Sequence, residues 1–190
     1  EPINQTYPQL EIILHEVQTE VMLNKLSEGT LDAGILATPI EMTGLEEIIL
    51  YTEPFYVATN SQHPFASKLS IKKEDLHGET LLLLEDGHCL RGQALDVCSD
   101  AMTKERKDFR GTSLETIRHM VSAGIGITLI PQTAIDYKNL IQNSSIKYIP
   151  FNEPAPARRV GLLFRETNTR KVCFQKLAIS IQSITQKEFL

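Results

Sequence analysis

Two cysteines are the residues of this sequence best suited to chemistry. The segment GHCLRGQALDVC places Cys89 and Cys98 in one short stretch of the chain. The thiolate, not the thiol, is the reactive form of cysteine, and a helix N-terminus or a neighbouring cation favours it. A turn glycine and His88 precede the first cysteine, and Arg91 follows it. The pattern therefore indicates a reactive thiol at Cys89 with a second thiol nearby, which is the composition of a redox switch.

The spacing of the two cysteines determines what their oxidation would do. Apolar residues recur at helical spacing between residues 89 and 102, which predicts a helix that begins near Cys89. On a continuous helix the two Cα atoms would lie about 13 Å apart, at ~1.5 Å per residue, whereas a disulfide needs roughly 4.4 to 6.8 Å. If oxidation joins Cys89 to Cys98, the helix between them must therefore unwind.

Two other interpretations of these cysteines remain open at this point. Free cysteines of cytosolic proteins are most often small buried hydrophobes, and burial is the better interpretation of Cys98 taken alone. For Cys89 the neighbouring glycine, histidine and arginine argue against an apolar site. A metal site is a poor competitor, because ligand pairs usually lie roughly two to four residues apart and no second pair completes a site. We therefore expect neither a metal nor a cofactor.

The composition is that of an ordinary folded domain without an electrostatic surface for nucleic acid. The chain has 190 residues, of which 42% are hydrophobic, and its formal net charge is −5. This length allows one large domain or two small ones with a real core. The sequence has no basic run, so we do not expect this fragment to bind DNA alone. It has no long apolar stretch and no leader, so we expect neither a membrane anchor nor export. Three cysteines do not form a stabilising disulfide framework, so we expect the protein in a reducing cytoplasm. We expect Cys173 to be an ordinary packed thiol in a helix.

Strand and helix patterns alternate along the chain, which favours an α/β fold with mainly parallel strand pairing. Thr19 is placed as the N-cap of the first helix and Gly29 as its stop. Strands are expected at residues 10–15, 32–38, 46–50, 55–59, 81–84, 127–130, 146–150 and 160–164, and around Phe109. Helices are expected at residues 19–27, 89–102 and 113–123, after Pro131, and from Thr169 onward.

Two breaks in these patterns predict where the chain passes between two subdomains. They lie at residues 51–54 and at the proline-rich residues 153–157. Paired crossings there give a first subdomain of residues 1–51 plus 160–190 and a second of residues 52–159, which holds both redox cysteines. Each is expected to be a Rossmann-like α/β unit, and the cleft between them is a default ligand site. A single continuous sheet with irregular loops is the alternative.

The sequence around the cysteines resembles a known family. GHCLRGQALDVC, the preceding LLLLED and the following FRGTSLETIRHMVSAGIGITLIP are similar to the effector domain of peroxide-sensing LysR-type transcription regulators, and the likeness runs through nearly the whole chain. The resemblance implies a two-lobed, periplasmic-binding-protein-like α/β domain that forms a homodimer, and a tetramer in the full-length protein. In the intact regulator this domain would control an N-terminal winged helix-turn-helix, which we expect to be absent from this chain.

The resemblance also assigns roles to single residues. It implies that Cys89 is the peroxidatic cysteine and that Cys98 is its disulfide partner. Thr19, His88 and Arg158 fall where the family contacts peroxide or the reacting sulfur. These five residues, assigned by the resemblance, form the candidate site.

The mechanism implied by the resemblance is stoichiometric sensing rather than enzymatic turnover. Hydrogen peroxide would oxidise Cys89 to a sulfenic acid, and Cys98 would condense with it to a disulfide. Glutaredoxin or thioredoxin would reduce that disulfide, and DNA and RNA polymerase would be partners only through the intact bacterial regulator. Gly92 departs from the family pattern, in which many relatives carry aspartate, and a glycine there would loosen the helix that must unwind.

Two other classes of function are kept as alternatives. A LysR-type effector domain for a small organic metabolite would use the cleft between the lobes, and its response would survive the loss of Cys89. A thiol peroxidase or a cysteine hydrolase would turn over many substrate molecules per protein, but the histidines lack the motif context of a hydrolase. Thiol alkylation distinguishes the metabolite alternative from a redox sensor.

Overall fold

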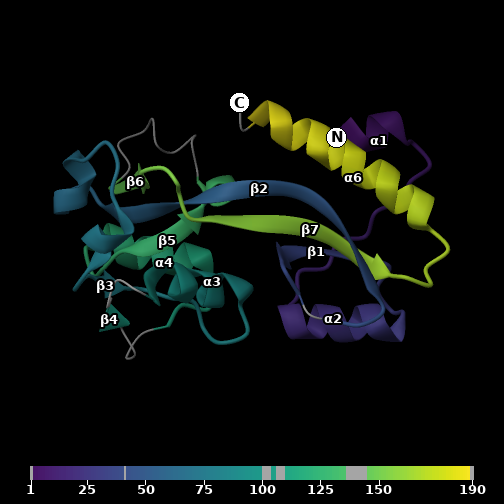
Figure 1. Ribbon diagram of the computed structural model, residues 1–190, viewed down its shortest axis with the longest axis horizontal. Helices are drawn as coiled ribbons and strands as arrows, with labels where there is room; N and C mark the ends of the chain where they lie inside the picture. The colour runs from purple at the N-terminus through teal and green to yellow at the C-terminus, as the bar shows by residue number, and fades with distance from the viewer. Residues whose placement is uncertain (1, 41, 100–103, 106–109, 136–144, 189–190) are drawn as a thin grey trace. The chain divides into compact units, whose positions relative to one another are not determined.

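The computed structural model describes residues 2–40, 42–99, 104–105, 110–135 and 145–188. The chain divides into two compact units (Figure 1). The first comprises Glu1–Thr52 with Arg159–Leu190, and the second comprises Glu53–Arg158. Each unit is built from helices and strands, and one long strand, β2 (Leu45–Asn60), contributes to both.

The first unit has a helix on each face of its sheet, because its strands are apolar on both sides. Successive side chains of a strand point to opposite faces. In the last strand, Leu162 and Phe164 pack with Phe174 of the C-terminal helix, whereas Leu163 packs with Leu26 of the helix on the other face. Apart from β2, the elements of this unit are α1 (Pro2–Thr6), α2 (Thr19–Glu28), β1 (Ala33–Thr38), β7 (Ala157–Arg165) and α6 (Lys171–Glu188).

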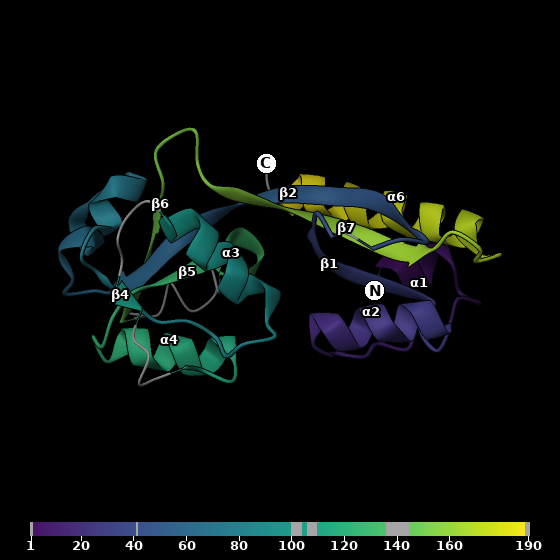
Figure 2. The same cartoon turned by 60° about the horizontal axis from the view of Figure 1, so that its bottom comes forward.

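The second unit repeats this design around the apolar run that precedes the cysteine helix. Leu81 and Leu83 belong to one buried cluster with Cys98, whereas Leu82 belongs to another with Ile117. This alternation places α3 and α4 on opposite faces, as Figure 2 shows. The described elements of this unit are η1 (Pro64–Ser67), η2 (Lys73–Leu76), β3 (Thr80–Leu81), α3 (Cys89–Cys98), β4 (Lys104–Glu105), α4 (Leu114–Ser122), β5 (Thr128–Pro131), η4 (Gln132–Ala134) and β6 (Ile146–Pro150).

Helix boundaries follow local signals in the sequence. The Ser113 hydroxyl accepts a hydrogen bond from the backbone N–H of Thr116 at 3.2 Å, so Ser113 caps α4 where the pattern predicts its start. Gly29 ends α2 in the left-handed conformation, with φ of 84°, as predicted. The N-cap of the same helix is Gln18, one position earlier than predicted, so Thr19 is the first helical residue.

The expectation of mainly parallel pairing is wrong for the principal strands. β1 pairs antiparallel with β7, and β2 pairs antiparallel with both β5 and β6. Parallel pairing is seen between β3 and β4 and in single bridges such as Leu81 with Ile127. The difference arises because the strands predicted at residues 46–50 and 55–59 form one continuous strand, β2, and its partners return along it.

Three smaller expectations differ from the structure or lie outside it. Residues 10–15 form no strand, because no described strand offers their backbone hydrogen-bond partners. Ile13 and Leu14 are 71% and 88% exposed. After Pro131 the described residues form the short 3-10 helix η4, and residues 136–144, where the expected helix would continue, lie outside the described ranges. The strand expected around Phe109 and the helical residues expected beyond Cys98 up to Met102 fall largely outside the described residues. No helix in the described ranges is long and apolar enough to cross a membrane.

Candidate functional site

The two cysteines lie at opposite ends of one helix. Cys89 is the first residue of α3, which confirms the predicted helix start, and Cys98 is the last. Cys89 is half-buried, whereas Cys98 is only 3% exposed and belongs to an apolar cluster. No disulfide joins them, and the rise of the helix separates their Cα atoms by about 13 Å. Bringing the two sulfurs together therefore requires α3 to unwind.

His88 precedes the helix in an extended conformation, with φ of −90° and ψ of 122°. It occupies the N-cap position, but its side chain does not cap the helix and makes no hydrogen bond with the residues that the structure describes. The first turn of a helix carries unsatisfied N–H groups and a partial positive charge. The side chain at the N-cap position therefore does not occupy the free N–H groups of the first turn, close to which Cys89 lies.

Arg91 is held in an ion-pair network rather than directed at the sulfur. Its Nε atom donates to Asp86 at 2.8 Å, and its Nη2 atom lies 2.9 Å from Glu105. Arg110 contacts the same two carboxylates. The expectation that the Arg91 charge favours the Cys89 thiolate is therefore weakened, because two carboxylates already balance that charge. The network instead ties the first turn of α3 to β4, which follows the helix.

Arg158 is directed at the cysteine helix from the start of β7. Its side chain is only 18% exposed, and its Nε atom donates to Glu53 at 2.8 Å. Its Nη1 atom donates to the side-chain oxygen of Gln93 at 3.4 Å. Gln93 lies one helical turn after Cys89, and residues four apart share one face of a helix. The structure therefore brings Arg158 to the face of α3 that carries Cys89.

Glu53 is a residue of this site that the sequence analysis missed. Its side chain is 0% exposed, and besides Arg158 it accepts hydrogen bonds from the backbone N–H and the hydroxyl of Thr133, at 2.8 and 2.7 Å. The sequence pattern predicts that Glu53 lies in a break between strands. A carboxylate between the apolar stretches 48–51 and 55–58 is the signal that could have identified it, because a fully buried charge needs specific partners.

Thr19 belongs to the other unit. It is the half-buried first residue of α2, and its hydroxyl makes no hydrogen bond within the described part of the chain. The peroxide contact that the family resemblance gives to Thr19 stays a prediction.

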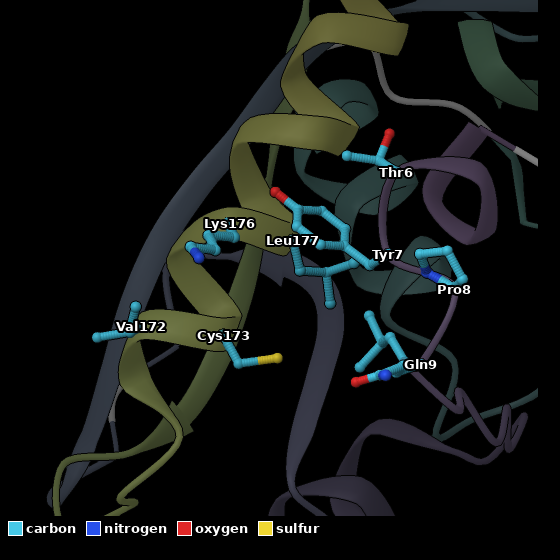
Figure 3. A pocket seen from close by; sticks show the side chains of 9 residues that line it. Thr6, Tyr7, Pro8, Gln9, Val172, Cys173, Lys176 and Leu177 are labelled. Atoms are coloured by element: carbon cyan, nitrogen blue, oxygen red, sulfur yellow. The ribbon is translucent and has the colours of Figure 1, made fainter.

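Cys173 lies far along the chain from the other cysteines, on α6 in the first unit. It is half-buried and helps to line a cavity of about 540 Å³ between α6 and the N-terminal residues. Figure 3 shows its sulfur directed from α6 toward the segment that carries Gln9. The expectation of an ordinary packed thiol therefore needs correction, because one side of Cys173 faces this space. Among the described residues, no cluster of His, Cys, Asp or Glu could hold a metal ion.

Comparison with known proteins gives a consistent result for the whole domain. The family model of the LysR substrate binding domain matches residues 2–181. The hydrogen peroxide-inducible genes activator of Escherichia coli is 41% identical over 181 residues, which cover 95% of this chain and 59% of the activator. The chain thus spans less than two thirds of that relative.

Solved structures of OxyR share the fold. The crystal structure of the oxidised form of OxyR matches with a TM-score of 0.87 and 41% identity, over 99% of this chain and 88% of that one. The crystal structure of the reduced form matches with a TM-score of 0.83 and 40% identity, over 95% of this chain and 84% of that one. Both similarities extend across the two units.

Proposed function

Because the chain belongs to the LysR substrate-binding domain family, we propose that it is the peroxide-sensing regulatory domain of a transcription regulator. The observation that carries the proposal is the placement of Cys89 and Cys98 at the two ends of α3. The two compact units would be the two regulatory subdomains. We take hydrogen peroxide as the signal because the similar Escherichia coli protein is named a hydrogen peroxide-inducible genes activator. We take an oxidised and a reduced form as the two states because OxyR has been solved in both.

The first step is oxidation of Cys89. Its thiolate attacks one oxygen of hydrogen peroxide, so an S–O bond forms, the O–O bond breaks, and hydroxide leaves with the electron pair and takes up a proton to become water. Hydroxide is a poor leaving group, so donors near the departing oxygen accelerate the step. The terminal nitrogens of Arg158 are suited to this role because Nη1 reaches the same helix face, and His88 offers an imidazole on the residue that precedes Cys89.

The second step converts this chemistry into a change of shape. The sulfur of Cys98 attacks the sulfenic acid of Cys89, an S–S bond forms, and water leaves with the oxygen. Per peroxide molecule, two thiols are oxidised and two water molecules are produced. Since a disulfide cannot span the intact helix, closing it unwinds α3 and withdraws Cys98 from its apolar cluster.

The wider roles are part of the same proposal. The domain would act as a homodimer, and the exposed apolar side chains of Ile12, Ile13 and Leu14 support self-association. DNA and RNA polymerase would be reached only through the intact regulator, and glutaredoxin or thioredoxin would reset the disulfide in a reducing cytoplasm. The domain would respond once per peroxide molecule, as a sensor and not as an enzyme.

Mass spectrometry of the chain before and after one equivalent of hydrogen peroxide tests this function. We expect the loss of two hydrogens, mapped to the peptide that joins Cys89 to Cys98, while Cys173 remains a thiol. A Cys173→Ser variant serves as the matched control and should respond in the same way. An unchanged mass, or oxidation confined to Cys173, would contradict the proposal. A response that survives Cys89→Ser would favour a metabolite effector instead.

A further inference from the structure

Among the described residues of the second unit, Glu53 is the most completely buried carboxylate, and nothing in the proposed chemistry uses it directly. Its side chain is 0% exposed, yet both of its carboxylate oxygens accept hydrogen bonds. One carboxylate oxygen accepts from Arg158, and the other accepts from the backbone and the hydroxyl of Thr133. A charge withdrawn from water is stable only with such partners. The arrangement therefore fixes Glu53 firmly in place.

The contact with Glu53 determines how the guanidinium of Arg158 is oriented. Glu53 engages the Nε atom, which is the inner nitrogen of the group. The guanidinium is a planar fork, so holding its inner nitrogen sets the plane of the two terminal nitrogens. One of these, Nη1, reaches Gln93 on α3. An arginine without this contact would sample several rotamers, because its side chain has four rotatable bonds.

We propose that Glu53 is a positioning residue for the reaction of Cys89 with peroxide. By holding the inner nitrogen of Arg158, it keeps the terminal N–H groups aimed at the face of α3 where hydroxide departs as the O–O bond of peroxide breaks. Thr133 orients Glu53 in turn through two hydrogen bonds. The inference rests on the proposed function, and it adds that a buried carboxylate distant in sequence from the cysteines sets the rate at which they sense peroxide.

A simpler role for Glu53 predicts the opposite outcome. If the carboxylate only neutralised Arg158, its removal would leave the site more positive, the Cys89 thiolate would be favoured, and peroxide would react faster. If Glu53 positions the guanidinium, its removal slows the reaction even though the site becomes more positive. The direction of the change therefore separates the two roles.

Two nearly isosteric variants test this directly. Glu53→Gln removes the charge while keeping the shape. Arg158→Gln places an amide nitrogen where Nε stands, so Glu53 keeps a donor while the terminal nitrogens are lost. Both are made in a background in which Cys98→Ala and Cys173→Ser leave Cys89 as the one thiol, and its sulfenic acid is trapped with dimedone. The second-order rate constant with hydrogen peroxide is compared with that of alkylation by iodoacetamide, which expels no hydroxide.

We expect Arg158→Gln to slow peroxide oxidation about 100-fold, as the loss of one preorganised donor does elsewhere. Glu53→Gln should slow it about tenfold, through misplacement of the guanidinium. The double variant should be no slower than Arg158→Gln alone, because Glu53 acts only through Arg158. Alkylation follows the thiolate population alone, so in all three variants the fall in peroxide oxidation should exceed any fall in alkylation. Glu46→Gln, on the same strand but paired with Lys171, is the matched control and should react like the parent.

A second variant keeps the test decisive if Glu53→Gln unfolds. Thr133→Val retains the carboxylate and its charge but removes one of its donors, and we expect roughly a two- to threefold slower peroxide reaction that disappears in the Arg158→Gln background. Circular dichroism checks that each variant is folded. Three results would overturn the inference. The first is a peroxide rate constant of Glu53→Gln or Thr133→Val equal to or above that of the parent. The others are effects that multiply in the double variants, and a fall in the alkylation rate as large as the fall in the peroxide rate. A parent chain that peroxide does not oxidise would overturn the proposed function, and this inference with it.

Discussion

Replacing Gly92 with alanine tests whether unwinding of α3 sets the redox balance of the two cysteines. Gly92 is an exposed residue inside α3, and a Cβ atom built there meets nothing within 4 Å. Its φ lies outside the left-handed region, so alanine fits without strain. Alanine in a helix interior is more stable than glycine by roughly 0.5–1 kcal/mol. The substitution should therefore stabilise the intact helix, which is the reduced form.

The size of the effect on the disulfide follows from this difference. If the oxidised form has lost the helix around position 92, alanine stabilises only the reduced form. The equilibrium constant for oxidation then falls about two- to fivefold, and since 30 mV corresponds to ~1.4 kcal/mol, the reduction potential rises by about 10–20 mV. Equilibration with mixtures of reduced and oxidised glutathione, followed by alkylation and mass spectrometry, measures that potential.

A matched control separates helix unwinding from general stabilisation. Asn24 is an exposed residue inside α2, and Asn24→Ala raises helix propensity by a similar amount in the other unit. We expect both variants to raise the melting temperature but only Gly92→Ala to raise the potential. An unshifted potential in a Gly92→Ala chain that melts higher, or an equal shift in Asn24→Ala, would refute the reasoning.

Three further predictions concern the surroundings of the helix. Arg91→Met removes the ion pairs of α3 with Asp86 and Glu105 and should destabilise the reduced form alone by ~1–2 kcal/mol. We therefore expect the reduction potential to fall by about 20–40 mV in the same glutathione titration. An unchanged potential would show that the ion-pair network survives oxidation. Leu83→Ala should lower the free energy of unfolding in urea by about 2–5 kcal/mol, because Leu83 is buried beneath α3. The exposed Leu69→Ala should change it by under about 0.5 kcal/mol, and similar losses in both would contradict the described core. A Cys98→Ala chain should retain a dimedone adduct after peroxide treatment, and absence of the adduct would remove the sulfenic acid from the mechanism.

The parts of the fold that depend on local signals were predictable from the sequence. The start of α3 follows from a turn glycine and helical spacing of apolar residues, and β6 (Ile146–Pro150) has the bounds that its apolar pattern predicts. The serine cap of α4 and the glycine at the end of α2 are equally local. Such signals involve residues within one or two turns of each other, so a single sequence contains them.

Long-range polar contacts of the site were not predictable in the same way. Glu53 meets Thr133 and Arg158 only after the chain has folded, and neither partner shares a periodic pattern with it. Arg91 beside a cysteine suggests a cation for the thiolate, yet Glu105 and a preceding aspartate neutralise it in space. Strand pairing is similarly non-local, which is why the apolar residues 10–15 were predicted as a strand although no described strand pairs with them.

Amide hydrogen exchange of α3 before and after one equivalent of hydrogen peroxide tests the central claim most directly. In the reduced chain we expect protected amides between Cys89 and Cys98, because that segment is a helix packed on the core. After oxidation we expect the disulfide in the same peptide and the loss of that protection. A disulfide between these cysteines with unchanged protection of α3 would contradict the claim that joining them unwinds the helix.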